Sequence, residues 1–241
     1  MKTAIHTEYS PLAKRVEGAR DPKDAKPRSA WGILFHTTGS GITAKAKKTG
    51  KKPINVALAY YITSQNGANG YLWGGAHYVL DYDGTLWQLA PDNVVVNHCG
   101  GPDRAAYLNG GWHKLASKEI IARWHAQWGP RYKNPYELFP SKSPNLDYIG
   151  VEMLPIGNGF GGSPMSPGLL YTRAQHEAAV ALATDCGMRH GWPTGWQAGP
   201  RLLGHEDVQP IARDDAGGGW DPGSLRAKPR FDFDFVRKSV A

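Results

Sequence analysis

The chain has 241 residues, of which 41% are hydrophobic and 20% charged, and this composition describes a folded globular protein rather than a disordered one. No apolar run approaches the roughly 18 residues that a membrane-spanning helix needs, so no membrane span is expected. The formal net charge of +7 favours an anionic partner. The basic residues are scattered except at Lys45–Lys52, and no nucleic-acid-binding motif accompanies that segment, so nucleic acid is not predicted as a partner.

Residues 1–30 are polar and contain prolines, and they are expected to form an N-terminal arm that packs on one domain, residues 31–241. The first residues hold no apolar stretch of signal-peptide length, which predicts synthesis in the cytoplasm without Sec export. Two loop insertions are expected within the domain, at about 39–70 and 101–147. The first contains Lys45–Lys52, which we interpret as a lysine-rich loop. Cys99 and Cys186 are interpreted as small buried side chains rather than a disulfide.

The hydrophobic pattern along the chain predicts an α/β domain with a central mixed sheet flanked by helices. The segments expected to be strands are Gly32–Thr37, Ala76–Leu80, Thr85–Leu89, Val94–His98, Tyr148–Leu154 and Arg201–Gly204. The second and third of these form a hairpin in this interpretation, because Asp-Gly lies between them. The segments expected to be helical are Ile54–Thr63, Ser117–Trp128 and a helix that Thr172 caps and that ends near His190. The closing segment Phe231–Val236 is expected to dock on the domain.

Two histidines directly follow short apolar runs. His36 follows Ile33–Phe35, and His205 follows Leu202–Gly204. At such a place a buried strand ends and can present its last side chain at one edge of a sheet. Two imidazoles and a carboxylate make a three-ligand zinc site, and zinc with an open fourth position is a hydrolytic catalyst. A structural histidine in the core is the alternative interpretation of each position taken alone.

Four blocks of sequence extend this observation, and they are Ile33–Thr37, Gly75–Leu89 with Asn97–Gly100, Tyr148–Met153, and Gly204–Pro210 with Trp220–Gly223. In this order they resemble the zinc-dependent N-acetylmuramoyl-L-alanine amidases of the type-2 amidase and peptidoglycan-recognition superfamily. The resemblance implies a single α/β domain, a zinc cleft at one end of its strands, and peptidoglycan as the substrate.

By this resemblance His36 and His205 are the two imidazole ligands of a catalytic Zn2+. The third ligand of the family is normally the aspartate of an Asp-Pro-Gly that follows the second histidine. Asp215 lies at the common spacing from His205, but Ala-Gly follows it. Asp221 lies further along the chain, within an intact Trp-Asp-Pro-Gly. We therefore favour Asp221 as the third ligand, with Asp215 as the alternative.

The carboxylate of Glu152 stands between Val151 and Met153 on an expected central strand, where burial is costly unless the group is paired or functional. Its counterpart in the family is the general base, which takes a proton from water and returns it to the leaving amine. Phage lysozyme-like members carry a catalytic tyrosine before the histidine of the second block, where this chain has Ala76. The resemblance thus favours the branch that uses the glutamate. A structural ion pair is the alternative role of Glu152.

Three more residues receive a role through the resemblance. His98 occupies the position of a family histidine that lines the cleft, and it is expected to contact substrate. His77 is expected to be a core or supporting residue. Many members place a lysine before the ligand aspartate to stabilise the oxyanion, whereas here Arg213 is the nearest cation and the candidate substitute.

The function implied is hydrolysis of the amide between the lactyl group of N-acetylmuramic acid and L-alanine, by a monomer. The setting is expected to be a phage endolysin released through a holin or an antibacterial effector exported without Sec, and a cytoplasmic recycling enzyme is favoured less. A non-catalytic peptidoglycan-binding protein on the same fold is the alternative, because Asp221 is displaced and the lysine is missing. A nucleic-acid-binding protein would rest on charge alone.

Overall fold

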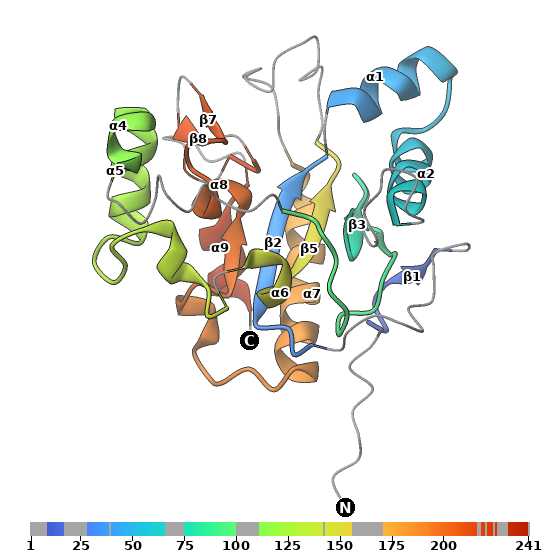
Figure 1. Cartoon of the computed structure of the whole chain (residues 1–241). Coiled ribbons are helices and arrows are strands. Elements are labelled where there is room, and N and C mark those ends of the chain that lie inside the picture. Colours follow the sequence, from blue (N-terminus) through green and yellow to red (C-terminus); the bar gives the residue numbers. More distant parts are fainter. Residues whose placement is uncertain are drawn as a thin grey trace, which may run out of the picture.

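A computed structural model of the chain describes residues 9–16, 28–38, 40–65, 75–99, 111–141, 143–155, 171–215, 218–219, 221–223, 225 and 231–240. These residues form one layered unit with a six-stranded mixed sheet at its centre and helices on both sides (Figure 1). The predicted fold class, a single α/β domain with a mixed sheet flanked by helices, is therefore confirmed. Within the described residues, no helix is both long and apolar enough to cross a membrane.

The strands of the central sheet run in the order β1-β4-β3-β5-β2-β6. Their bounds are Lys14–Arg15 for β1, Gly32–Thr37 for β2, Tyr78–Leu80 for β3, Leu86–Gln88 for β4, Tyr148–Met153 for β5 and Leu202–Gly204 for β6. Only β3 and β4 pair in the antiparallel direction, and all other neighbours in this sheet are parallel. A separate small hairpin joins β7, Asp214–Asp215, to β8, Gly218–Gly219.

The α-helices are α1 at Ser40–Thr49, α2 at Pro53–Gln65, α4 at Trp112–Leu115, α5 at Lys118–Gln127, α6 at Pro144–Asp147, α7 at Arg173–Arg189, α8 at His205–Val208 and α9 at Phe233–Ser239. Two short 3-10 helices, η1 and η2, span Pro135–Leu138 and Trp196–Ala198. The predicted helices at Ile54–Thr63, Ser117–Trp128 and Thr172–His190 are confirmed as α2, α5 and α7. The capping box of α7 is also present, since Thr172 and Gln175 exchange hydrogen bonds.

The two faces of the sheet pack against different helices because side chains alternate between faces along a strand. Ile33 and Phe35 of β2 join a core cluster with residues of α7 and α9. Leu34, between them, packs instead with Trp112 of α4 and Trp124 of α5. All six residues of β2 and of β5 are buried, which is the pattern of central strands covered on both faces.

The interpretation of Lys45–Lys52 as a loop is wrong, because its first residues lie on helix α1. Ile42 and Ala46 are both buried and pack in a cluster with residues of α2. Residues four apart lie on one face of a helix, so this apolar pair docks α1 while the lysines face outward. The tertiary contact stabilises a helix that the lysine-rich composition did not indicate.

Three other expectations are modified by the structure. The hairpin around Asp83-Gly84 is confirmed as β3 and β4, but Val94–His98 forms isolated β-bridges at residues 94 and 97 rather than a strand. The closing segment contains the start of helix α9. Within the expected N-terminal arm, β1 adds an edge strand to the sheet beside β4. The domain limits and the two insertions stay predictions, and parts of both insertions lie outside the described residues.

A buried charge network lies against α7. The carboxylate of Asp92 is fully buried, and its Oδ2 is 2.6 Å from Nη2 of Arg189. Its Oδ1 accepts hydrogen bonds from the Tyr78 hydroxyl at 2.6 Å and from the Gln88 amide at 3.1 Å. Asp185 also pairs with Arg189, at 2.8 Å. This network ties α7 to β3 and β4 and to the segment that follows them.

Replacing Asp92 by alanine should therefore destabilise the fold. The change removes one partner of the Arg189 charge inside the protein, which is expected to lower the free energy of unfolding by about 3 kcal/mol. Thermal unfolding measures the effect. Arg173→Ala is the control, because Arg173 and Glu177 form an exposed ion pair whose loss should cost less than about 0.5 kcal/mol. If the two variants lowered the unfolding temperature equally, the prediction that the buried ion pair contributes more stability than the exposed one would be contradicted.

Candidate active site

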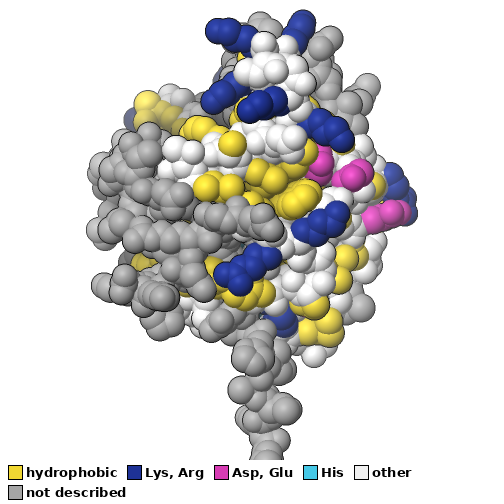
Figure 2. All heavy atoms as spheres, turned by 90° about the vertical axis from the view of Figure 1, so that its right-hand side faces the viewer, with side chains coloured by type: hydrophobic (Ala, Val, Ile, Leu, Met, Phe, Trp, Pro, Cys, Tyr) yellow, Lys and Arg dark blue, Asp and Glu magenta, His cyan; other side chains and the backbone are white. Residues whose placement is uncertain are grey.

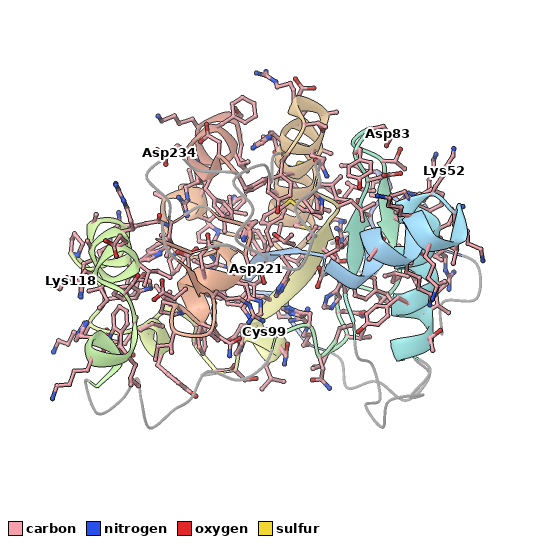
Figure 3. The ribbon with its side chains drawn as sticks, turned by 90° about the horizontal axis from the view of Figure 1, so that it is seen from above. Lys52, Asp83, Cys99, Lys118, Asp221 and Asp234 are labelled. Carbon is pink, nitrogen blue, oxygen red and sulfur yellow. The ribbon has the colours of Figure 1, made fainter. Side chains whose placement is uncertain are left out.

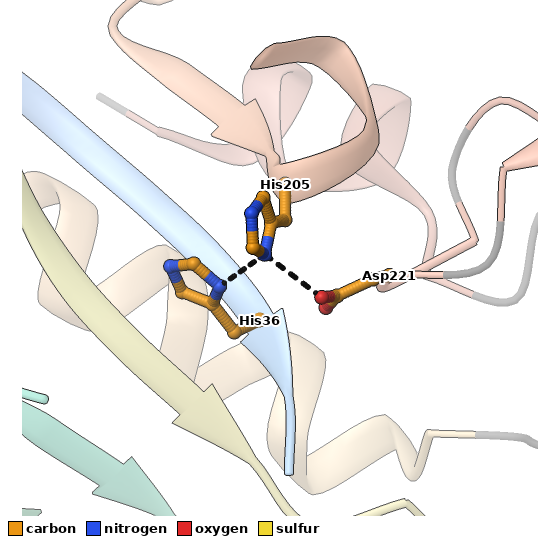
Figure 4. Close-up of side chains that lie close together, drawn as sticks. All are labelled: His36, His205 and Asp221. Carbon is orange, nitrogen blue, oxygen red and sulfur yellow. Dashed lines mark hydrogen bonds and ion pairs between the residues drawn. The ribbon is translucent and has the colours of Figure 1, made fainter. Parts of the chain in front are cut away.

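Two parallel strands deliver two histidines to the same edge of the sheet. Phe35 of β2 pairs with Gly204 of β6, and the residues that follow them are His36 and His205. His205 begins the short helix α8, and both imidazoles are buried. Because the carboxyl ends of parallel strands meet at one edge, the apolar runs before the two histidines place them side by side, as Figure 4 shows.

The third member of this group is Asp221. One nitrogen of each ring and one carboxylate oxygen lie within 4.8 Å of one another, and all three side chains are buried. Nδ1 of His36 is 2.9 Å from Nδ1 of His205, which is in turn 2.9 Å from Oδ2 of Asp221. Two imidazole nitrogens and a carboxylate oxygen that converge in this way are a donor set that suits zinc. The group therefore fits a metal ion.

The atoms of Asp221 and His205 that face away from the group are also held in place. Oδ1 of Asp221 accepts a hydrogen bond of 2.5 Å from the backbone N–H of Thr37. Nε2 of His205 lies 2.5 Å from Oε1 of Gln209 and 3.2 Å from Sγ of Cys99. Since the amide oxygen can only accept, the ring donates from Nε2 and leaves Nδ1 to face the group. Such outer hydrogen bonds orient metal ligands.

The position of Asp221 depends on Glu206. The sequence alone did not predict a role for this residue. The carboxylate of Glu206 is fully buried and accepts hydrogen bonds from the backbone N–H groups of Gly223 at 2.8 Å and Leu225 at 3.1 Å. The backbone N–H of Glu206 donates to the carbonyl of Asp221 at 3.0 Å. These bonds hold Asp221, Gly223 and Leu225 close to α8. The one signal in the sequence for this anchoring role is that Glu206 directly follows His205.

Asp215, the alternative ligand, lies in β7, where its backbone pairs with Gly218. Its side chain lies outside the part of the chain that the structure describes. The preference for Asp221 over Asp215 therefore stays a prediction, which the convergence of Asp221 with His36 and His205 supports.

The charges of the two histidines differ. Burial, and then the neighbouring His205, lower the pKa of His36 well below its usual value, so this ring is neutral. Burial also lowers the pKa of His205, but Cys99 and Asp221 outweigh that effect and raise it to about 10. A cation that binds between His205 and Asp221 must displace this proton, so its affinity is expected to rise with pH.

Glu152 lies next to this group because it pairs in register with His36 across β2 and β5. Residues paired in register point to the same face of a sheet, so its carboxylate shares the face of the His36 ring. Burial, and then the Asp221 carboxylate, raise the pKa of Glu152 to about 8. Its Oε2 is buried without a hydrogen-bond partner among the described residues. A buried carboxylate oxygen without a hydrogen-bond partner is costly, so we look for a function that explains it.

The hydroxyl of Tyr61 donates a hydrogen bond to Glu152, and this contact was also missed by the sequence reasoning. Tyr61 lies on α2 and is buried. Its ring passes close to Gly75, where a Cβ atom would come within 3.1 Å of Cδ1. A phenol from α2 thus reaches the glutamate in a chain that has Ala76 in place of the tyrosine of other members. Nothing in the local sequence around Tyr61 indicates this.

The raised pKa of Glu152 predicts a dependence of stability on pH. In protein stripped of metal, the folded chain keeps the Glu152 proton up to about pH 8, whereas the unfolded chain loses it near the ordinary value of 4.5. The stabilisation is therefore complete below pH 4.5 and is lost as the pH rises through 8. Glu152→Gln should remove a fall of about a few kcal/mol across this interval, as measured by urea unfolding at several pH values. If the free energy of unfolding changed with pH in the same way in the wild type and in Glu152→Gln, this prediction would be contradicted.

The remaining candidates are placed as follows. The His98 ring lies between His36 and the backbone carbonyl of Tyr148, and whether it contacts substrate stays a prediction. His77 is fully buried, and its Nδ1 accepts a hydrogen bond from the backbone N–H of Gly150, so its core role is confirmed. Nε of Arg213 donates to Oδ2 of Asp221 at 3.0 Å, and its role at an oxyanion stays a prediction.

Both cysteines are buried, as expected, and within the described residues neither forms a disulfide. Seen along the strand ends, Asp221 and Cys99 lie near the centre of the molecule, with Lys118 of α5 on one side and Lys52, after α1, on the other (Figure 3). The site thus occupies the edge of the sheet between two groups of helices.

Two solved structures are similar to the chain. One is an endolysin N-acetylmuramoyl-L-alanine amidase, LysCS, from Clostridium intestinale URNW, with 14% identity, a TM-score of 0.42 and 97% of each chain covered. The other is the N-acetylmuramoyl-L-alanine amidase LysC from the same organism, with 13% identity, a TM-score of 0.43, and 96% of this chain and 98% of that chain covered. At these low identities and TM-scores, the similarity says nothing about the activity of this chain. Among curated proteins, none matches.

The match to a family model is more informative. Residues 26–224 match Amidase_2, described as N-acetylmuramoyl-L-alanine amidase. The matched range contains His36, Glu152, His205 and Asp221, and it spans most of the 241 residues. The match confirms the predicted enzyme class. The chain therefore belongs to the Amidase_2 family of N-acetylmuramoyl-L-alanine amidases.

Proposed function

We propose that the chain hydrolyses the amide bond between the lactyl group of N-acetylmuramic acid and the L-alanine of peptidoglycan, with Zn2+ held by His36, His205 and Asp221. The observation that carries this proposal is the convergence of Nδ1 of His36, Nδ1 of His205 and Oδ2 of Asp221 at the end of β2. The family match supplies the substrate class.

A zinc ion bound there would polarise the scissile carbonyl and lower the pKa of a water molecule. Glu152 performs the proton transfers in this proposal. Its unpaired Oε2 accepts a proton from the attacking water and donates it to the nitrogen of the leaving L-alanine. The hydrogen bond from Tyr61 holds the other carboxylate oxygen, which orients Oε2. A nearby cation favours the charged carboxylate, so the pKa of Glu152 falls towards neutral pH when the site is loaded.

The products of peptidoglycan digestion test the proposed bond. Purified peptidoglycan is incubated with the protein and Zn2+, and the soluble products are analysed by mass spectrometry. Hydrolysis at the proposed bond releases stem peptides with a free L-alanine amino group and leaves the lactyl group on the glycan. Cleavage between sugars or within the stem peptide would refute the proposed bond. Retention of wall fragments without any cleavage would support the non-catalytic binding protein instead.

We further propose that the enzyme acts on the cell wall as a lytic enzyme, either a phage endolysin or an antibacterial effector. The exposed lysines on and after α1 support this proposal. Lys45, Lys47 and Lys48 of α1 and Lys51 and Lys52 beyond it are all exposed. Figure 2 shows Lys and Arg side chains around the upper part of this face, where α1 lies. A positive surface of this kind attracts an anionic wall over about 8 Å at physiological salt.

Neutralising Lys45, Lys47 and Lys48 by glutamine should slow lysis of intact wall at low salt by about tenfold, because electrostatic attraction accelerates encounter by about 10-fold or more. Cleavage of a small soluble muropeptide should change little, since the three side chains lie outside the site. Turbidity loss of walls and release of free amine from the muropeptide measure the two rates. The matched control neutralises three exposed charges of α4 and α5, namely Lys114, Lys118 and Arg123. An equal effect of the control would assign the attraction to overall charge.

A further inference from the structure

We propose that His98 is a positioning residue that fixes the ring of His36 for metal binding, in place of the substrate contact that the sequence predicts. The inference rests on the proposed function only in that it takes His36 as a metal ligand. His98 lies in the segment after the β3–β4 hairpin, far from His36 in sequence, and both its ring nitrogens are engaged within the described residues.

The hydrogen bonds of the two rings have a defined direction. Nε2 of His98 lies 3.0 Å from the carbonyl oxygen of Tyr148, which can only accept, so His98 carries its proton on Nε2. In the neutral ring Nδ1 is then an acceptor, and it lies 3.0 Å from Nε2 of His36. His36 therefore donates from Nε2, and its Nδ1 lone pair points towards His205. This is the atom that converges with His205 and Asp221.

The packing around His98 holds its ring in this place. The ring lies on the bare backbone of Gly150, where a Cβ atom would come within 2.4 Å of Cγ of His98. Gly150 and Glu152 point to the same face of β5, so the missing side chain at Gly150 makes room for the His98 ring beside the glutamate. A side chain at Gly150 would force the ring away from His36.

The backbone of the His98 segment is fixed independently by Asn145. Oδ1 of Asn145 accepts hydrogen bonds from the N–H groups of His98 at 3.0 Å and Cys99 at 2.9 Å. Nδ2 of Asn145 donates to the carbonyl of Cys99 at 2.8 Å. Both the backbone and the ring of His98 are thus held in place. A residue that orients another side chain needs such a fixed position, whereas a residue that adapts to a bound substrate does not.

The other two members of the site are held in a comparable way, by Gln209 on His205 and by the backbone of Thr37 on Asp221. His205 and Gln209 lie four residues apart, so that hydrogen bond is local. His36 lies on a strand, where sequence neighbours point to the opposite face and cannot reach its ring. Its orienting partner must therefore come from elsewhere in the chain, and His98 fills that position.

The affinity for Zn2+ tests the role of His98. The dissociation constant of Zn2+ is measured by competition with a chromophoric chelator, without substrate, for the wild type, His98→Phe and His98→Asn. Phenylalanine keeps a ring but removes the acceptor, and Zn2+ should bind about 10- to 100-fold more weakly. Asparagine keeps an acceptor near the place of Nδ1, and the affinity should recover to within about threefold of the wild type. Far-ultraviolet circular dichroism checks that each variant is folded.

The kinetics separate the two roles of His98. With Zn2+ at saturation, KM of His98→Phe for a soluble muropeptide should stay within about twofold of the wild-type value. An unchanged affinity for Zn2+ together with a KM raised tenfold or more would overturn the proposal and restore the substrate contact.

Nitrogen-15 NMR of the wild type gives a second test that needs no variant. In the zinc-bound protein, His98 and His36 should each carry their proton on Nε2, with Nδ1 of His98 unprotonated. A proton on Nδ1 of His98 would overturn the proposal. Because the zinc affinity and the NMR measurement use no peptidoglycan, failure of the proposed bond specificity would leave these two results unchanged, and failure here would leave the proposed reaction standing.

Discussion

Alanine in place of either His36 or His205 is expected to abolish the binding of Zn2+ and to reduce wall hydrolysis to the level of a protein-free control. Each change removes one of two buried nitrogens that lie 2.9 Å apart at the proposed metal position. With only one imidazole left, the group no longer offers the three protein ligands of a catalytic zinc site. Zinc content after gel filtration and release of stem peptides are the two measurements.

The control for this prediction is His113→Ala. His113 is an exposed histidine that stacks on His125, away from the group. It should keep both zinc and activity. A His36→Ala protein that still binds one Zn2+ with wild-type affinity would refute the assignment of this ligand.

The same assay decides between the two candidate aspartates. Asp221→Ala should lose zinc, whereas Asp215→Ala should retain it, because Asp221 converges with both histidines and is anchored by Thr37. The reverse result would transfer the third ligand to Asp215.

Glutamine in place of Glu152 is expected to leave the fold and Zn2+ binding intact and to lower turnover by about 10²- to 10⁴-fold, the usual contribution of a general base. Glutamine has nearly the same shape and can still accept the hydrogen bond from Tyr61, but it cannot take a proton from water. The rate of muropeptide cleavage with Zn2+ at saturation measures the effect, and KM should change little.

Tyr61→Phe is the companion variant. It removes the hydrogen bond that orients Glu152 while leaving the carboxylate, so its turnover should lie between those of the wild type and Glu152→Gln. A Glu152→Gln enzyme with nearly the wild-type rate would show that another group transfers the proton.

Much of the fold follows from short-range patterns in the sequence. The runs of apolar and small residues that begin β2 and β5, Gly32–Phe35 and Tyr148–Val151, indicate central strands, because only strands covered on both faces bury every side chain. Asp83-Gly84 permits the tight turn of the hairpin, and Thr172 with Gln175 caps α7. Each of these signals acts within a few residues, so each can be read without knowing the tertiary structure.

The two histidines of the site were also predictable, because each directly follows a short apolar run. Glu152 was accessible for a similar reason, since a carboxylate on a central strand is costly unless it has a role. What the sequence could not decide is which side chains surround them. Whether His36, Glu152 and His205 meet depends on β2 lying between β5 and β6, and this strand order is a property of the whole sheet.

The contacts that complete the site come from segments far apart in the chain. Glu206 draws Asp221 to the histidines, Tyr61 reaches Glu152 from α2, and His98 reaches His36 over the bare backbone of Gly150. Such contacts depend on how helices and loops pack around the sheet, and no local pattern of polar or apolar residues encodes them. The sequence by itself determined the strands and the residues at their ends, and only the tertiary structure decided their partners.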